Sequence, residues 1–199
     1  MLNNSFEVDS FLDEQELLGL SKYYQKLPKA YNSGDEKKAY TTGFPWADLP
    51  MKKIKDKVEK VFGKCNVGVS MFLEEFEPWG VHTDFLQGGD NVPYYAVLIP
   101  LDFEDKPTHT IIFDQQATDS DWKEKLTNKT HHPYTDKDLN LLDHIDNDLL
   151  DKLSIDNTFK WEKGKLIAWH RNFLHTSDNF KATGMNRKIA LVLFLNKDD

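Results

Sequence analysis

The sequence predicts a mainly β protein, a sandwich or jelly roll whose N-terminal side carries helices. Apolar residues at helical spacing occupy the first third of the chain. The pattern then changes to alternation, with Val67, Val69, Met71 and Leu73 at every second position. Because successive side chains of a strand point to opposite faces, this alternation is typical of a half-buried strand. Two helices followed by many short strands indicate a β core with helices packed at one side.

Two amphipathic helices are expected before the strands. The first covers residues 9–28, where Asp9 or Ser10 can cap the N-terminus. The second covers residues 48–62, with apolar residues along one side and lysines along the other. Residues 29–46 lack a clear period, so we expect a loop that can include a short strand.

Further strands are expected where short apolar runs are bounded by polar or turn residues. Apolar residues recur at helical spacing in 136–153, within a polar region of about 116–155, which predicts a helical insertion between strands. The chain is therefore expected to form one domain, residues 1–199, with helical support in 1–65 and a β core in 66–196. The strands are predicted at 67–73, 94–101, 108–113, 164–169 and 187–195.

The composition excludes several classes of protein. The 33 acidic and 25 basic residues give a net charge of −8, which disfavours a nucleic-acid partner. Cys65 is the single cysteine, so neither an internal disulfide nor a cysteine-based zinc site can form. The first residues lack the basic and apolar regions of a signal peptide, and the apolar runs are too short to span a bilayer. We therefore expect a cytoplasmic protein without a membrane partner.

A His-x-Asp tripeptide is the first feature that indicates chemistry. His82 and Asp84 lie in an extended segment, where side chains two positions apart share a face. Together they can present one nitrogen and one oxygen to a common point. A second histidine would complete the facial arrangement of two histidines and one carboxylate that binds non-haem iron(II).

The C-terminal part of the chain offers two histidines for that third position. A predicted strand ends near His170, His175 follows it, and Arg187 begins the last apolar strand. The pair His131-His132 is a further candidate for a metal site, but no carboxylate accompanies it at ligand spacing in a strand. A solvated surface is the simpler interpretation of that pair.

In the order and spacing of these residues the sequence resembles the 2-oxoglutarate/iron(II) oxygenase superfamily. Its pattern is His-x-Asp, a long gap, a distal histidine, and an arginine or lysine about ten residues later. The resemblance covers roughly residues 66–196 and is greatest for the compact prolyl-hydroxylase-like group and small oxygenases of bacteria and phages. It implies a double-stranded β-helix core, a cupin-like jelly roll. The family spacing favours His175 over His170.

The resemblance also implies roles for individual residues. His82, Asp84 and His175 would hold Fe(II), while 2-oxoglutarate would chelate the metal through its keto acid end. Arg187 would neutralise the distal carboxylate of the co-substrate, because a guanidinium meets a carboxylate with two parallel hydrogen bonds. Tyr94 or Tyr95 would assist with a hydroxyl group, and both are candidates because the sequence does not distinguish them.

Two positions depart from the family pattern. A serine is common two residues after the arginine, where this chain has Ile189. A tyrosine is frequent where this chain has Phe76. Both changes remove a hydroxyl group, so they affect the expected co-substrate contacts and leave the expected metal ligands intact.

The activity implied by the resemblance is that of a dioxygenase, and we expect a hydroxylase. It would consume O2 and 2-oxoglutarate, release succinate and CO2, and use ascorbate as a candidate reductant. The substrate would be a peptidyl proline, a free amino acid or another small metabolite. The alternatives are a non-catalytic jelly-roll or cupin-like binding module, and a metal-dependent cupin of another reaction type.

Overall fold

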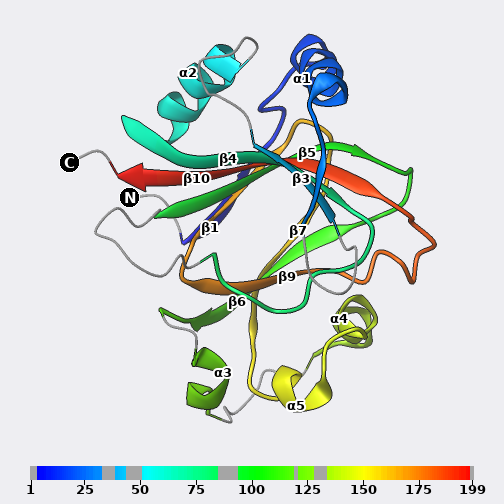
Figure 1. The fold of residues 1–199 in the computed structure, drawn as a ribbon. Coiled ribbons are helices and arrows are strands. Elements are labelled where there is room, and N and C mark those ends of the chain that lie inside the picture. The colour runs from blue at the N-terminus through cyan, green and yellow to red at the C-terminus, as the bar shows by residue number, and fades with distance from the viewer. Residues whose placement is uncertain are drawn as a thin grey trace.

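Two antiparallel sheets face each other in the computed structural model, which describes residues 4–32, 39–43, 51–84, 94–118, 121–127 and 134–197 (Figure 1). Within these residues the larger sheet has the strand order β1-β8-β5-β10-β4-β3-β2, and the smaller sheet has the order β7-β6-β9. The larger sheet consists of β1 (Ser5–Val8), β8 (Leu166–His170), β5 (Tyr95–Phe103), β10 (Lys188–Lys197), β4 (Cys65–Glu75), β3 (Ala39–Gly43) and β2 (Ala30–Asn32). The smaller sheet consists of β7 (Ile155–Lys160), β6 (His109–Gln116) and β9 (Phe173–Ser177). The expected mainly β jelly roll is confirmed.

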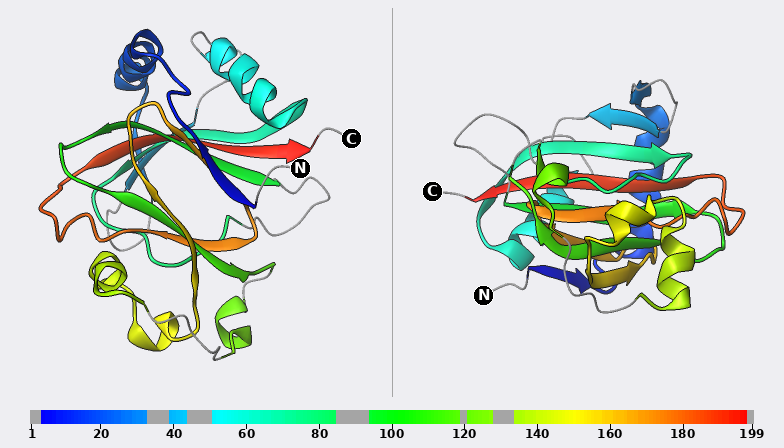
Figure 2. Two further views of the ribbon diagram at one scale, coloured as in Figure 1. Left: turned by 180° about the vertical axis from the view of Figure 1, so that it is seen from behind. Right: turned by 90° about the horizontal axis from the view of Figure 1, so that it is seen from below.

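Helices cover the outer faces of both sheets (Figures 1 and 2). The helices α1 (Glu14–Lys26) and α2 (Met51–Phe62) lie on the larger sheet. Three short helices, α3 (Trp122–Lys125), α4 (Asp136–Leu142) and α5 (Asn147–Leu150), lie beyond the smaller sheet. No helix in the described parts of the chain is long and apolar enough to cross a membrane.

Each layer boundary contains its own apolar cluster. Leu20 of α1 and Ile54 of α2 pack with Phe72 and Leu191 between the helices and the larger sheet, and all four are fully buried. A second cluster, which includes Trp161, fills the space between the two sheets. A third lies between the smaller sheet and the short helices. The cluster between the sheets is the one that forms the walls of the cavity described below.

The N-terminal helix begins later than the sequence predicts. Asp13 caps it instead of Asp9 or Ser10, and its carboxylate accepts a hydrogen bond of 2.8 Å from the backbone N–H of Glu16. The Glu16 carboxylate in turn accepts one of 2.9 Å from the backbone N–H of Asp13. This reciprocal capping box satisfies two N–H groups that the first helical turn leaves without partners, so it fixes the start of the helix.

Several strands were not expected from the sequence. The strand β1 is short, and β7 is mostly polar, so neither gives a clear apolar period. Both are held by pairing with distant partners, β1 with β8 and β7 with β6. The residues expected to form one helical insertion form the separate helices α4 and α5, because Asp146 caps a new helix start.

Candidate active site

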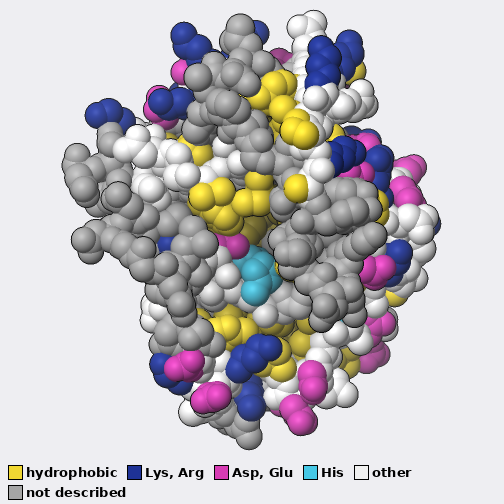
Figure 3. Space-filling model, viewed as in Figure 1, with side chains coloured by type: hydrophobic (Ala, Val, Ile, Leu, Met, Phe, Trp, Pro, Cys, Tyr) yellow, Lys and Arg dark blue, Asp and Glu magenta, His cyan; other side chains and the backbone are white. Residues whose placement is uncertain are grey.

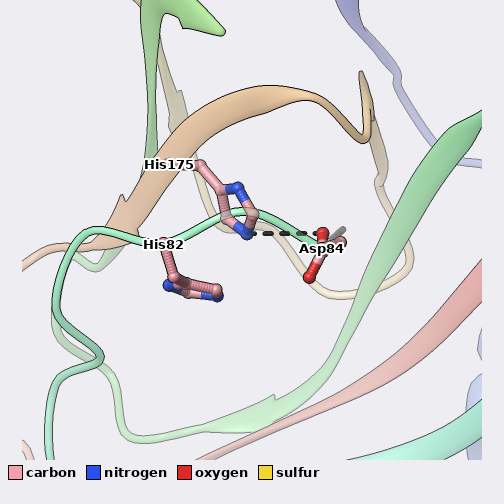
Figure 4. Close-up of side chains that lie close together, drawn as sticks. All are labelled: His82, Asp84 and His175. Carbon is pink, nitrogen blue, oxygen red and sulfur yellow. Dashed lines mark ion pairs between the residues drawn. The ribbon is translucent and has the colours of Figure 1, made fainter. Parts of the chain in front are cut away.

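Three side chains from two distant segments converge between the sheets (Figure 4). His82 and Asp84 lie in the segment after β4, and His175 lies in β9. One ligand atom from each residue lies within 4.8 Å of the ligand atoms of the other two. The His175 Nε2 atom is 3.4 Å from Oδ2 of Asp84. Two imidazole nitrogens and one carboxylate oxygen are the donor set of a facial iron(II) site.

Backbone pairing brings the two histidines together. The N–H of His82 donates to the carbonyl oxygen of His175 at 3.0 Å, and the N–H of His175 donates to the carbonyl oxygen of His82 at 2.9 Å. Their ring centroids are 4.2 Å apart. The reciprocal bonds form an isolated antiparallel bridge, in which opposing side chains lie close together.

Hydrogen bonds also orient both imidazole rings. The Nδ1 atom of His82 is 2.7 Å from the carbonyl oxygen of Gly80, and Nδ1 of His175 is 3.1 Å from that of Phe173. A carbonyl oxygen only accepts, so each Nδ1 carries the proton and each Nε2 keeps a free lone pair. Such a bond on the far nitrogen is typical of metal-binding histidines, because it fixes the tautomer and the ring orientation.

Burial keeps His175 neutral, which is the form in which an imidazole can bind a metal. Loss of solvent lowers the pKa of His175 to about 4, while the nearby Asp84 carboxylate raises it and His82 lowers it further. His175 is therefore neutral at pH 7. The Oδ2 atom of Asp84 is buried and has no hydrogen-bond partner among the described residues. A buried carboxylate oxygen beside two Nε2 lone pairs fits a cation, which would satisfy all three atoms.

A cavity of about 240 Å³ adjoins this cluster. In the space-filling view, histidine side chains lie in a hollow with an acidic side chain and hydrophobic side chains around them (Figure 3). Three tryptophans, Trp79, Trp161 and Trp169, form much of the aromatic wall. Within the described part of the chain, the polar residues along the cavity other than the three candidate ligands are Glu75, Thr110, Thr176, Ser177 and Lys188.

Lys188 is the cation among the described residues that line the cavity, and it was not expected from the sequence. Its side chain is fully buried, and its Nζ atom lies 4.3 Å from the ring centroid of Trp161 and 4.7 Å from that of Phe180. The same Nζ atom is 3.3 Å from Oε2 of Glu75. Neither atom of that ion pair has a hydrogen bond of good geometry within the described part of the chain. An ammonium group with hydrogen-bonding capacity left over indicates a place for an anion.

Arg187, the cation expected from the sequence, lies elsewhere. It donates hydrogen bonds to Glu74 at 3.3 Å and to Asp102 at 2.9 Å, and 45% of its side chain is exposed. The next residues explain this position. Ile189 belongs to the apolar cluster beneath the helices, so alternation along β10 sends Arg187 to that same face and Lys188 to the cavity.

The two candidate tyrosines also lie outside the cavity. Tyr95 belongs to the cluster beneath the helices, with its ring centroid 5.3 Å from that of Phe62 and 6.0 Å from that of Phe6. Tyr94 packs against the same cluster. The hydroxyl groups that do line the cavity are those of threonine and serine, among them Thr110, which accepts a hydrogen bond of 2.8 Å from Nε1 of Trp161.

The remaining histidine candidates are separate from the three converging side chains. His170 ends β8, and its ring contacts those of Tyr95 and Phe173 at centroid distances of 6.0 and 6.4 Å. It is not a member of the cluster formed by His82, Asp84 and His175. The pair His131-His132 lies outside the described residues.

Comparison with known proteins agrees with this arrangement. The sequence matches no protein-family model, and a search of curated proteins finds no significant match. Solved structures do match over nearly the whole chain. A viral collagen prolyl hydroxylase from Paramecium bursaria Chlorella virus-1, in complex with 2-oxoglutarate, has a TM-score of 0.55 at 14% identity, covering 98% of this chain and 97% of that one.

Two bacterial structures give similar values. A prolyl-4-hydroxylase from Pseudomonas putida has a TM-score of 0.57 at 9% identity, covering 98% of this chain and 94% of that one. HygX from Streptomyces hygroscopicus, with nickel and 2-oxoglutarate bound, has a TM-score of 0.59 at 9% identity, covering 97% and 82%. At such identities the similarity shows the fold. The chain therefore has the double-stranded β-helix fold of the 2-oxoglutarate/iron(II) oxygenases, together with their His-x-Asp…His arrangement.

Proposed function

We propose that this protein is an iron(II)- and 2-oxoglutarate-dependent dioxygenase that hydroxylates a peptidyl proline, an amino acid or another small molecule. The observation that carries the proposal is the composition of a single cavity. The facial donor set of His82, Asp84 and His175 and the buried ammonium of Lys188 all line it. A metal-chelating keto acid with a distal carboxylate needs both features.

We assign the three candidate ligands to Fe(II) and Lys188 to the distal carboxylate of 2-oxoglutarate. Lys188 takes the role that the resemblance gave to Arg187. Its aromatic neighbours Trp161 and Phe180 favour a cation in that position and exclude water from it. In an apolar environment one charge-assisted hydrogen bond is stronger than in water, so a buried ammonium suffices to hold a carboxylate.

When bound, the metal and the keto acid together supply O2 activation, with release of succinate and CO2. The protein's own contribution is to hold the metal and the co-substrate and to orient the side chains that bind them. The hydrogen bonds from the two Nδ1–H groups fix the imidazole rings of His82 and His175, so that both Nε2 atoms point toward one position. The walls formed by Trp79 and Trp169 limit water around that point, which protects a reactive centre from side reactions.

The test is turnover of the keto acid. Protein reconstituted with Fe(II), 2-oxoglutarate and ascorbate in air should release succinate, slowly alone and faster with a true substrate. Panels of proline-containing peptides, free amino acids and small metabolites would distinguish the substrate classes, with product mass as readout. A protein that binds neither divalent metal nor 2-oxoglutarate would be a jelly-roll binding module instead, and metal-dependent chemistry without 2-oxoglutarate would indicate a different cupin reaction.

A further inference from the structure

A buried carboxylate shares the cavity with Lys188. Glu75 and Lys188 are directly opposite each other on the neighbouring strands β4 and β10. Glu75 is 3% exposed and Lys188 is fully buried, and 3.3 Å separates Oε2 of Glu75 from Nζ of Lys188. Both residues line the cavity. In the free protein, the ammonium group that should receive an anion is therefore already paired with one.

This pairing creates an electrostatic conflict for a dicarboxylate co-substrate. A carboxylate arriving at Lys188 meets one ammonium that already neutralises Glu75, so two negative charges would share one positive charge. In a buried site, two carboxylates beside each other cannot both remain ionised without a large energetic cost, and one of them takes up a proton. Glu75 is a side chain of the protein, so the incoming carboxylate cannot displace it as it could a bound anion.

The surroundings of Glu75 favour its protonation. Burial is the largest effect and raises the pKa of Glu75, and the negative charge of Asp178 raises it as well. The positive charge of Lys188 lowers the pKa. Asp178 itself is held by hydrogen bonds from Thr108 at 2.7 Å and with His109 at 2.9 Å. A carboxylate from the co-substrate would offset the lowering effect of Lys188 and raise the pKa further.

We propose that Glu75 takes up a proton from solvent when 2-oxoglutarate binds, and that the resulting carboxylic acid donates its O–H to the distal carboxylate beside Lys188. The inference rests on the proposed function, because it concerns the same co-substrate. The distal carboxylate would then accept one hydrogen bond from an ammonium and one from a neutral acid. The acid provides a donor that Tyr94 and Tyr95 cannot, since both lie on the far side of the larger sheet.

The consequence is a pH-dependent affinity with a defined sign. Proton uptake on binding means that affinity for 2-oxoglutarate falls as pH rises through the interval between the pKa of Glu75 in the free protein and its higher pKa in the complex. Within that interval the affinity should fall about tenfold per pH unit. Glu75→Gln carries an amide donor at the same place without a proton to gain, so its affinity should not follow this slope.

Calorimetry measures the proton directly. Manganese-loaded protein, kept free of oxygen, would be titrated with 2-oxoglutarate in buffers of different ionisation enthalpy. At a pH within that interval, wild-type protein should take up as much as about one more proton per bound 2-oxoglutarate than Glu75→Gln. The matched control is Glu74→Gln, the adjacent and equally buried glutamate, which faces away from the cavity and binds Tyr24, Lys29 and Arg187. It should show the wild-type proton uptake.

A second variant separates hydrogen bonding from packing. Glu75→Leu removes the donor and should bind 2-oxoglutarate at least about tenfold more weakly than Glu75→Gln, the loss expected for one hydrogen bond in a buried site. Tryptophan fluorescence serves as an independent readout, because Trp161 and Trp169 line the cavity. Equal affinities of the leucine and glutamine variants, or equal proton uptake by wild type and Glu75→Gln, would overturn the inference. If wild-type protein binds manganese but no 2-oxoglutarate, the proposed function fails instead.

Discussion

Arg187 and Lys188 are consecutive residues whose charged groups lie on opposite faces of the larger sheet. Arg187 reaches Glu74 and Asp102 on the side of the helices, and Lys188 reaches Glu75 in the cavity between the sheets. A shift of one residue along a strand therefore decides which cation faces the cavity lined by the three candidate ligands. Glu74 and Glu75 of β4 alternate in the same way, so each face of the larger sheet carries one glutamate paired with one basic residue.

The first prediction compares these two cations. Lys188→Ala should weaken 2-oxoglutarate binding by about 3–5 kcal/mol, because the distal carboxylate of the co-substrate would be buried without a cation as its partner. Arg187→Ala is the matched control and should change the affinity by less than about 1 kcal/mol, since the arginine is half exposed and pairs outside the cavity. Titration of manganese-loaded protein with 2-oxoglutarate would measure both. The opposite ranking would restore Arg187 as the co-substrate residue.

The second prediction concerns His175, the proposed third metal ligand. His175→Ala should abolish tight binding of a divalent ion, because two protein ligands no longer form a facial site. His170→Ala should keep the affinity within about threefold, since removing a contact outside the metal cluster costs little in ligand binding. Electron paramagnetic resonance of free Mn(II) during titration gives both values. Retained tight binding in His175→Ala would show that the cluster is not the metal site.

The third prediction is acid destabilisation of the metal-free protein through His175. Burial lowers the pKa of His175 from 6.5 to about 4, so between these values the unfolded chain binds a proton that the folded protein does not. Stability is therefore lost as pH falls through that interval, by about 3 kcal/mol for the full shift. Urea unfolding of chelator-treated protein at several pH values measures it. His175→Gln should lose less stability on acidification; an identical loss would contradict the buried neutral histidine.

The fourth prediction tests the start of α1. Asp13→Ala removes the capping box and should lower the free energy of unfolding by about 1 kcal/mol. Asp9→Ala should cost less, because the exposed Asp9 side chain pairs at 3.1 Å with a buried Lys165 that also has Glu7 and Glu162 as partners. Thermal or urea unfolding of the two variants distinguishes them. A larger loss in Asp9→Ala would move the helix start back to the position expected from the sequence.

The sequence by itself determined the parts of the site that depend on local spacing. His82 and Asp84 are two positions apart, a spacing that puts side chains on one face of an extended segment, and the structure brings them together after β4. The long alternating and apolar segments predicted the β core and the helices α1 and α2, because burial of one face imposes a period on the sequence. The third candidate ligand, His175, is distant in sequence, and it was identified from the resemblance in spacing to the oxygenase family.

The tertiary structure decided what depends on pairing between distant strands. The register of β10 against β4 sets Lys188 opposite Glu75, and the helix-side packing of Ile189 fixes which neighbouring residue faces the cavity. The apolar residues of the final strand are nearly continuous, so the sequence does not reveal which of them face the cavity. A strand buried on both faces carries no marker of inside and outside until its partners are in place, and so only the fold could identify Lys188 and Glu75.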